Sequence, residues 1–148
     1  MKVLFISPIE ADYIKKIYAN LVERNAEVVR VEYPSGNSLI GKIGAVFKFL
    51  GNIRKEAKKD YDVINVHYPF IAAVAFAFLR VDTPIVTTLH GSDAIYDELG
   101  GFKKKTRSVL TPFLKHLLNM SELVSVNTEF FKNEVVKIKT QHGQIIQG

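Results

Sequence analysis

Short apolar runs alternate with longer helix-like segments along the chain, and this alternation limits the folds that the sequence can adopt. The runs are rich in β-branched and aromatic residues and cover residues 2–7, 27–33, 61–67, 84–90, 123–127 and 144–147. Connections of helical length separate most of these runs, which is typical of strands that pair in parallel. We therefore predict an α/β fold with a doubly wound parallel sheet of about six strands in three α/β/α layers.

The connecting segments are predicted as helices over residues 10–25, 39–59, 69–81, 102–119 and 128–139. Residues 69–81 are apolar nearly all round, which predicts a helix buried between the sheet and another layer. Pro112 either starts a new helix or kinks the one that it interrupts. Residues 39–59 place apolar side chains on one helical stripe, which we expect to be buried: Leu39, Ile43, Val46, Leu50, Ile53 and Ala57.

The length of 148 residues suits one compact domain. The absence of cysteine excludes structural disulfides and thiolate metal sites. The N-terminus lacks the pattern of a signal peptide, and the longest apolar stretch, residues 70–79, is too short to span a bilayer. We therefore expect a cytoplasmic protein that is at most peripheral on the inner face of the membrane. Because a strand-like run stands directly before Gly148, we also expect residues 1–148 to be one domain cut from a longer chain.

Several common nucleotide and hydrolase motifs are absent. The loop after the first predicted strand contains no glycine, and the first glycine of the chain is Gly36, so a G-x-G-x-x-G dinucleotide fingerprint is missing. The chain also lacks a G-x-x-x-x-G-K-[ST] phosphate loop and a G-x-S-x-G nucleophile elbow. These absences argue against NAD binding of the Rossmann type, P-loop chemistry and serine hydrolysis.

The segment of residues 87–93 runs from a predicted strand into polar residues suited to ligand contact: His90, Gly91, Ser92 and Asp93. Ligands of open parallel sheets bind at the carboxyl ends of the strands. Histidine can donate, accept or carry charge near neutral pH, and glycine lets the backbone approach a ligand closely. Asp93 either contacts a ligand or caps a following helix.

His67 ends the preceding predicted strand, so His67 and His90 are expected at the same edge of the sheet. A shared zinc site lacks a third ligand with a characteristic spacing. Two histidines in one crevice favour a functional site over two structural residues. His116 falls within a predicted helix and is expected to be structural or solvated.

The net charge of +5 is concentrated in two segments, residues 42–59 and 102–107. A lysine-rich helix face is usually only solvated, but joined to an apolar stripe it also suits an anionic membrane surface. The residues expected to make that contact are Lys48, Lys55, Lys59, Lys103, Lys104 and Lys105. No nucleic-acid partner is expected, because the chain has no RNP or helix-turn-helix signature.

Four segments, in this order, resemble motifs of one enzyme family. Residues 62–69 (DVINVHYP) are similar to D-V-I-H-x-H-x-P, and residues 84–93 (PIVTTLHGSD) to P-x-V-x-T-x-H-G-x-D. Residues 124–132 (VSVNTEFFK) are similar to V-x-x-V-S-E-F-L-K, and residues 145–148 (IIQG) to V-I-P-N-G. Over essentially its whole length, the chain resembles the N-terminal domain of GT4-type (group 1, subfamily 4) glycosyltransferases with the GT-B fold.

The resemblance implies two Rossmann-like domains facing a cleft, of which this one binds the acceptor and the missing C-terminal one holds a nucleotide-sugar donor. It implies a retaining, metal-independent sugar transfer to a glycan or lipid-linked acceptor, without a cofactor. His90 would lie beside the donor sugar and orient the reacting groups. Asp93 would support that loop, which binds substrate through Gly91, Ser92 and Asp93, and His67 and Tyr68 would line the acceptor side. The isolated domain would be inactive.

The sequence departs from the family at the first loop, where Glu10 and Asp12 stand in place of a frequent pair of glycines, and at Asn65, where many members have histidine. Two alternatives stay open at the level of sequence. One is a stand-alone, non-catalytic α/β module that binds a phosphorylated or sugar ligand. The other is half of a different GT-B enzyme, such as a nucleotide-sugar epimerase.

Overall fold

The structure, a computed structural model, describes residues 1–7, 12–32, 39–90, 101–127, 132–133, 135–136 and 143–147, without the side chains of residues 39–42 and 101–107. Six parallel strands form one sheet in the order β2-β1-β3-β4-β5-β6. Their bounds are β1 (Lys2–Ser7), β2 (Glu27–Glu32), β3 (Val63–His67), β4 (Ile85–Leu89), β5 (Leu123–Val126) and β6 (Gln144–Gln147). The predicted six-stranded parallel sheet is confirmed.

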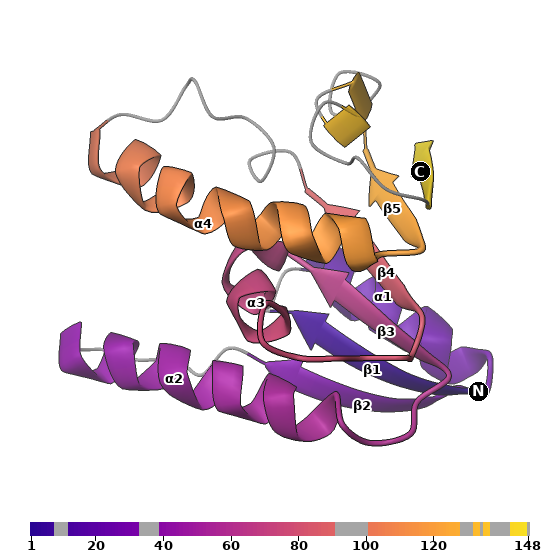
Figure 1. The fold of residues 1–148 in the computed structure, drawn as a ribbon. Helices are drawn as coiled ribbons and strands as arrows, with labels where there is room; N and C mark the ends of the chain where they lie inside the picture. The colour runs from indigo at the N-terminus through magenta and orange to yellow at the C-terminus, as the bar shows by residue number, and fades with distance from the viewer. Residues whose placement is uncertain are drawn as a thin grey trace.

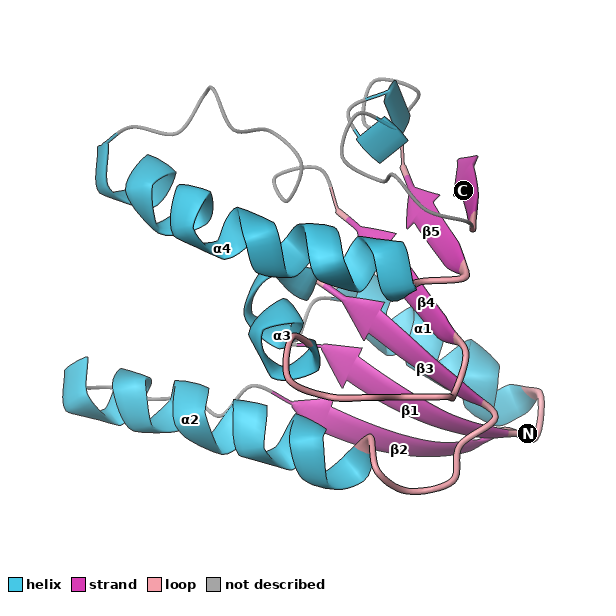
Figure 2. Cartoon of the chain, viewed as in Figure 1, coloured by secondary structure: helices cyan, strands magenta, loops and turns pink. Residues whose placement is uncertain are grey.

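Helices cover both faces of this sheet. The helix α1 (Asp12–Glu23) lies on one face, and α2 (Leu39–Glu56), α3 (Pro69–Phe76) and α4 (Gly101–Met120) lie on the other (Figure 1). Figure 2 shows α3 between α2 and α4, with the strands behind them. The three-layer, doubly wound arrangement of the prediction is therefore confirmed.

The alternation of side chains along β1 divides the interior between the two faces. Leu4 and Ile6 belong to the large core beneath α2, α3 and α4. Because neighbouring side chains of a strand point to opposite faces, Phe5 points toward α1, where its ring meets Tyr18 with 6.2 Å between centroids. Leu4, Phe5 and Ile6 are fully buried, and Tyr18 is half-buried. The central strand β1 is thus anchored from both layers.

Two predicted helices differ from the observed ones in their extent. Residues 101–120 form one helix, α4, with Pro112 inside it, so a new helix does not start at that proline. The predicted helix over residues 69–81 ends at Phe76. Within the described ranges, no helix combines the length and the apolar character needed to cross a bilayer.

The buried stripe of α2 is rotated relative to the predicted one. Ala45, Phe49 and Ile53 are buried, whereas Ile43, which we expected inside, is 52% exposed. Ile53 and Ala57 of the expected stripe are buried as predicted, but Phe49, which that stripe left out, packs into the core and leaves Ile43 outside. Two large apolar side chains of α2, Ile43 and Phe47, consequently face solvent.

A buried hydrogen bond joins the sheet to the end of α4. Thr87 Oγ1 of β4 lies 2.8 Å from Ser121 Oγ, and Ser121 Oγ donates to the Leu117 carbonyl oxygen at 2.8 Å. We expect Thr87→Val to lower the free energy of unfolding by about 1 kcal/mol, because the shape is kept and one buried hydrogen bond is lost. The half-buried neighbour Thr88 gives the control. Thr88→Val should lower the free energy of unfolding, measured by chemical denaturation, much less. Equal losses in the two variants would contradict a role for this bond.

Candidate functional site

The site lies where the chain order of the sheet reverses. The strand β1 has β2 on one side and β3 on the other, which makes the β1–β3 junction the switch point at which open α/β sheets bind ligands. His67 is the last residue of β3, and His90 directly follows β4. The parallel register places His67 opposite Thr88, two residues before His90. Both histidines therefore stand at the carboxyl edge of the sheet.

The two histidine side chains contact each other directly. His67 Nδ1 lies 2.9 Å from His90 Nε2, and the rings are stacked with 5.2 Å between their centroids. One proton lies between these two nitrogens, so the tautomer of one ring fixes that of the other. The structure therefore brings together the two histidines that the sequence assigned to one crevice.

His67 is buried and uncharged. Burial lowers the pKa of its imidazole to about 3, and the neighbouring His90 acts in the same direction. Its ring packs on Phe5 of β1 with 4.8 Å between centroids. The other ring nitrogen, Nε2, is buried and has no hydrogen-bond partner in the described part of the chain. Nδ1, which meets His90, is thus the nitrogen through which His67 acts on the site.

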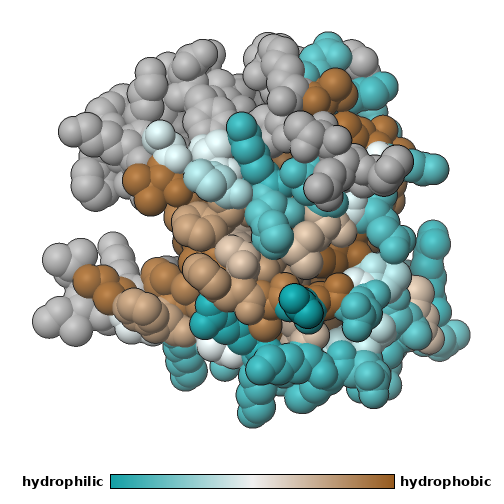
Figure 3. All heavy atoms as spheres, in the orientation of Figure 1, coloured by the Kyte–Doolittle hydropathy of each residue, from teal (hydrophilic) through white to brown (hydrophobic). Residues whose placement is uncertain are grey.

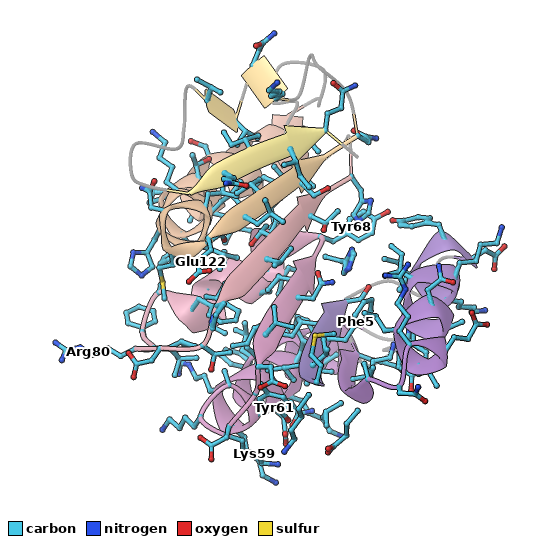
Figure 4. The ribbon with its side chains drawn as sticks, turned by 90° about the vertical axis from the view of Figure 1, so that its right-hand side faces the viewer. Phe5, Lys59, Tyr61, Tyr68, Arg80 and Glu122 are labelled. Carbon is cyan, nitrogen blue, oxygen red and sulfur yellow. The ribbon has the colours of Figure 1, made fainter. Side chains whose placement is uncertain are left out.

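Three aromatic rings meet at the more open side of this pair. The ring of His90 stacks on Tyr68 at 4.6 Å and lies 4.8 Å from Tyr13 of α1. The hydroxyl groups of Tyr13 and Tyr68 hydrogen-bond to each other. Figure 4 labels Phe5 and Tyr68, which lie on the side of the sheet that faces α1. Burial lowers the pKa of His90 as well, so the ring at the centre of this group is neutral at physiological pH.

This arrangement can be compared with known proteins. A sequence profile of Glycosyltransferase Family 4 matches residues 3–146, nearly the entire chain. The chain belongs to this family. A search of curated proteins finds no match. The parallel sheet and the family match together identify a glycosyltransferase family 4 domain with one Rossmann-like half of a GT-B fold.

Tyr68 of the family 4 domain has an unusual backbone. Its φ of 50° and ψ of 64° are left-handed, although it is neither glycine nor asparagine. This conformation costs a residue with a Cβ about 1–2 kcal/mol. It occurs at the turn between β3 and α3, just before Pro69, where an extended backbone is the usual choice. Strain of this kind gathers at functional sites, and here it accompanies the stacking of Tyr68 on His90.

Tyr13 is a site residue to which the sequence pattern gave no role. The sequence predicts a helix over residues 10–25 but assigns no role to Tyr13, the residue directly before the buried Ile14. A signal was present, because α1 follows β1 and its first turn must therefore begin at the carboxyl edge of the sheet. A large aromatic residue in that turn, one position outside the buried stripe, is placed to face the crevice.

The other predicted site residues lie outside the part of the chain that the structure describes. Gly91, Ser92 and Asp93 lie outside the described residues, and so does most of the first loop, residues 8–11. Among the residues that the structure describes, no group of three or more His, Cys, Asp or Glu side chains could hold a metal ion. His116 is exposed on α4 and belongs to neither the histidine pair nor its aromatic neighbours. The described site of the family 4 domain therefore consists of His67, His90, Tyr13, Tyr68 and Phe5.

Proposed function

We propose that this domain is the acceptor-binding half of a retaining glycosyltransferase. The enzyme moves a sugar from a nucleotide-sugar donor to a glycan or lipid-linked acceptor without a metal ion. The observation that carries this proposal is the group of stacked rings around His90 at the switch point of the sheet. Family membership supplies the reaction class, and the geometry suggests how an acceptor is held.

The rings fit a sugar in two ways. A pyranose has C–H faces that pack against aromatic rings and hydroxyl groups that need hydrogen-bond partners. Tyr13 and Tyr68 offer both a ring and a hydroxyl group at one place. A neutral His90 adds a hydrogen-bonding ring without bringing a positive charge to the acceptor. We infer that the acceptor sugar binds against Tyr13 and Tyr68.

His90 orients the reacting groups. It does not act as a metal ligand or as a lone acid or base. Its ring is held from two sides, by the hydrogen bond to His67 and by stacking on Tyr68. A ring fixed in this way presents its remaining edge in one orientation, which removes the entropic cost of ordering it during reaction. His67 is buried behind it and acts through His90 as a positioning residue.

Tyr13→Ala is expected to raise the acceptor KM about 5- to 10-fold, because one aromatic contact worth roughly 1–1.5 kcal/mol is lost. The donor KM should change little. Steady-state kinetics with saturating donor measures both constants. Val22→Ala, at an exposed position of the same helix, is the matched control. An acceptor KM that is the same in the Tyr13 variant and the control would remove Tyr13 from the acceptor site.

A further inference from the structure

An apolar band crosses the face of the molecule between α2 and α4. Its four most exposed members are Ile43 at 52%, Phe47 and Phe78 at 70% each, and Val109 at 68%. Figure 3 shows hydrophobic side chains filling the hollow between the two helices on this face. The band contains two strongly exposed phenylalanines, and contiguous exposed apolar surface of this kind marks an interaction site.

The band is continuous from one helix to the other. Ile43 and Phe47 are one turn apart on α2, and Arg54 follows two turns after Phe47 on the same flank. The guanidinium group of Arg54 lies 5.5 Å from the ring centre of Phe78. The ring of Phe78 in turn meets Phe113 of α4 with 6.4 Å between centroids.

The helix α3 forms the floor of this band. The sequence predicts that residues 69–81 are covered by another layer, because they are apolar nearly all round. The structure places α2 and α4 at the two sides of α3, where Ile71 and Val74 remain half-buried. In the described ranges, no third element lies over α3 between its two neighbours. The apolar outer side of α3 therefore adds to the exposed band.

Positive charge lies next to the band. Lys48 and Lys55 are exposed and lie seven residues apart on α2, so they share one side of the helix. That side adjoins the one that carries Phe47. Neither lysine forms an ion pair within the part of the chain that the structure describes. Lys59 differs, because its ammonium group lies 2.8 Å from a carboxylate oxygen of Glu56. Lys48 and Lys55, together with the exposed Arg54 over the Phe78 ring, therefore carry positive charge that a partner can contact, whereas Lys59 is paired with Glu56.

We propose that this band docks on an anionic membrane surface. Phe47 and Phe78 enter the boundary between headgroups and acyl chains, and Lys48 and Lys55 contact lipid phosphates. Aromatic side chains beside lysines are the composition of helices that lie in that boundary. A second copy of the chain fits less well, since a symmetric contact would place the same lysines of both copies near one another.

Vesicle co-sedimentation tests this proposal, with phosphatidylcholine vesicles that contain or lack phosphatidylglycerol. Wild-type protein should bind the anionic vesicles at least about 10-fold more strongly than the neutral ones, and added salt should weaken this preference. Phe47→Ser and Phe47→Ser/Phe78→Ser should lower binding to anionic vesicles, and Lys48→Gln/Lys55→Gln should weaken the preference for them. Phe47 is so exposed that its replacement should leave folding intact.

The helix α1 on the opposite face and the turn that follows it supply matched controls. Val22→Ser removes an exposed apolar side chain, and Lys16→Gln/Arg24→Gln removes two charges; both should bind vesicles like the wild type. Equal binding by wild type, band variants and controls would overturn the proposal. A dimer in solution that Phe47→Ser dissociates, without vesicle binding, would assign the band to a second copy and also overturn it. None of these variants changes a residue of the histidine pair. Neither result therefore bears on the proposed sugar transfer, which is tested separately.

Discussion

Replacing His90 by alanine is expected to lower kcat/KM for sugar transfer on the order of 100-fold. His90 is the ring at which the contacts of the site converge: its Nε2 lies 2.9 Å from His67 Nδ1, Tyr68 stacks on it, and the tilted ring of Tyr13 lies beside it. Its removal takes away the group that we propose orients the reacting sugars. The neighbours remain in place, so the loss should appear mainly in kcat when donor and acceptor are saturating.

The matched control is His116→Ala, which removes an exposed histidine of α4. The assay uses this domain together with the donor-binding half that we propose completes the enzyme. Thermal unfolding of both variants should stay close to that of the wild type. Transfer by the His90 variant at the rate of the His116 variant would remove His90 from the reaction.

Acidification from pH 7.5 to pH 5 is expected to destabilise the fold by about 2 kcal/mol through His67 alone. The pKa of His67 is about 3 in the folded protein and about 6.5 in the unfolded chain, so between these values only the unfolded chain takes up the proton. Stability is therefore full above about pH 6.5 and is lost as the pH falls toward 3. The lowered pKa of His90 adds a loss of the same sign.

Chemical denaturation at several pH values measures this dependence. In His67→Asn, the amide can still hydrogen-bond His90 from the position of Nδ1 but cannot titrate, so most of the dependence should disappear. His116→Asn should keep it, because that side chain is exposed in the folded protein. An unchanged pH dependence in His67→Asn would show that His67 is not a buried neutral group.

The parallel sheet and the meeting of the two histidines could be predicted from the sequence because both follow from local pattern. Short apolar runs separated by helical connections specify parallel pairing. Parallel strands then bring their carboxyl ends to one edge, so His67 and His90, each at the end of such a run, had to be neighbours. The family match agrees with the resemblance drawn from the same segments.

Features that depend on packing between distant elements could not be predicted in this way. The rotation of α2, which buries Phe49 and exposes Ile43, depends on the shape of α3 and the sheet beneath it. The left-handed Tyr68 contradicts the local preference of a residue before proline, so tertiary contacts must hold it. Tyr13 becomes a site residue only through rings that lie 55 residues further along the chain or more.

A donor screen tests the proposed transferase most directly. The protein with its donor-binding half is incubated with a panel of radiolabelled nucleotide sugars and with lipid and glycan extracts as acceptors. We expect label from at least one donor to enter an acceptor, with retention at the anomeric carbon and without added metal. Reversible capture of a sugar or phosphorylated ligand, with no transfer from any donor, would contradict the proposal and would identify a binding module instead.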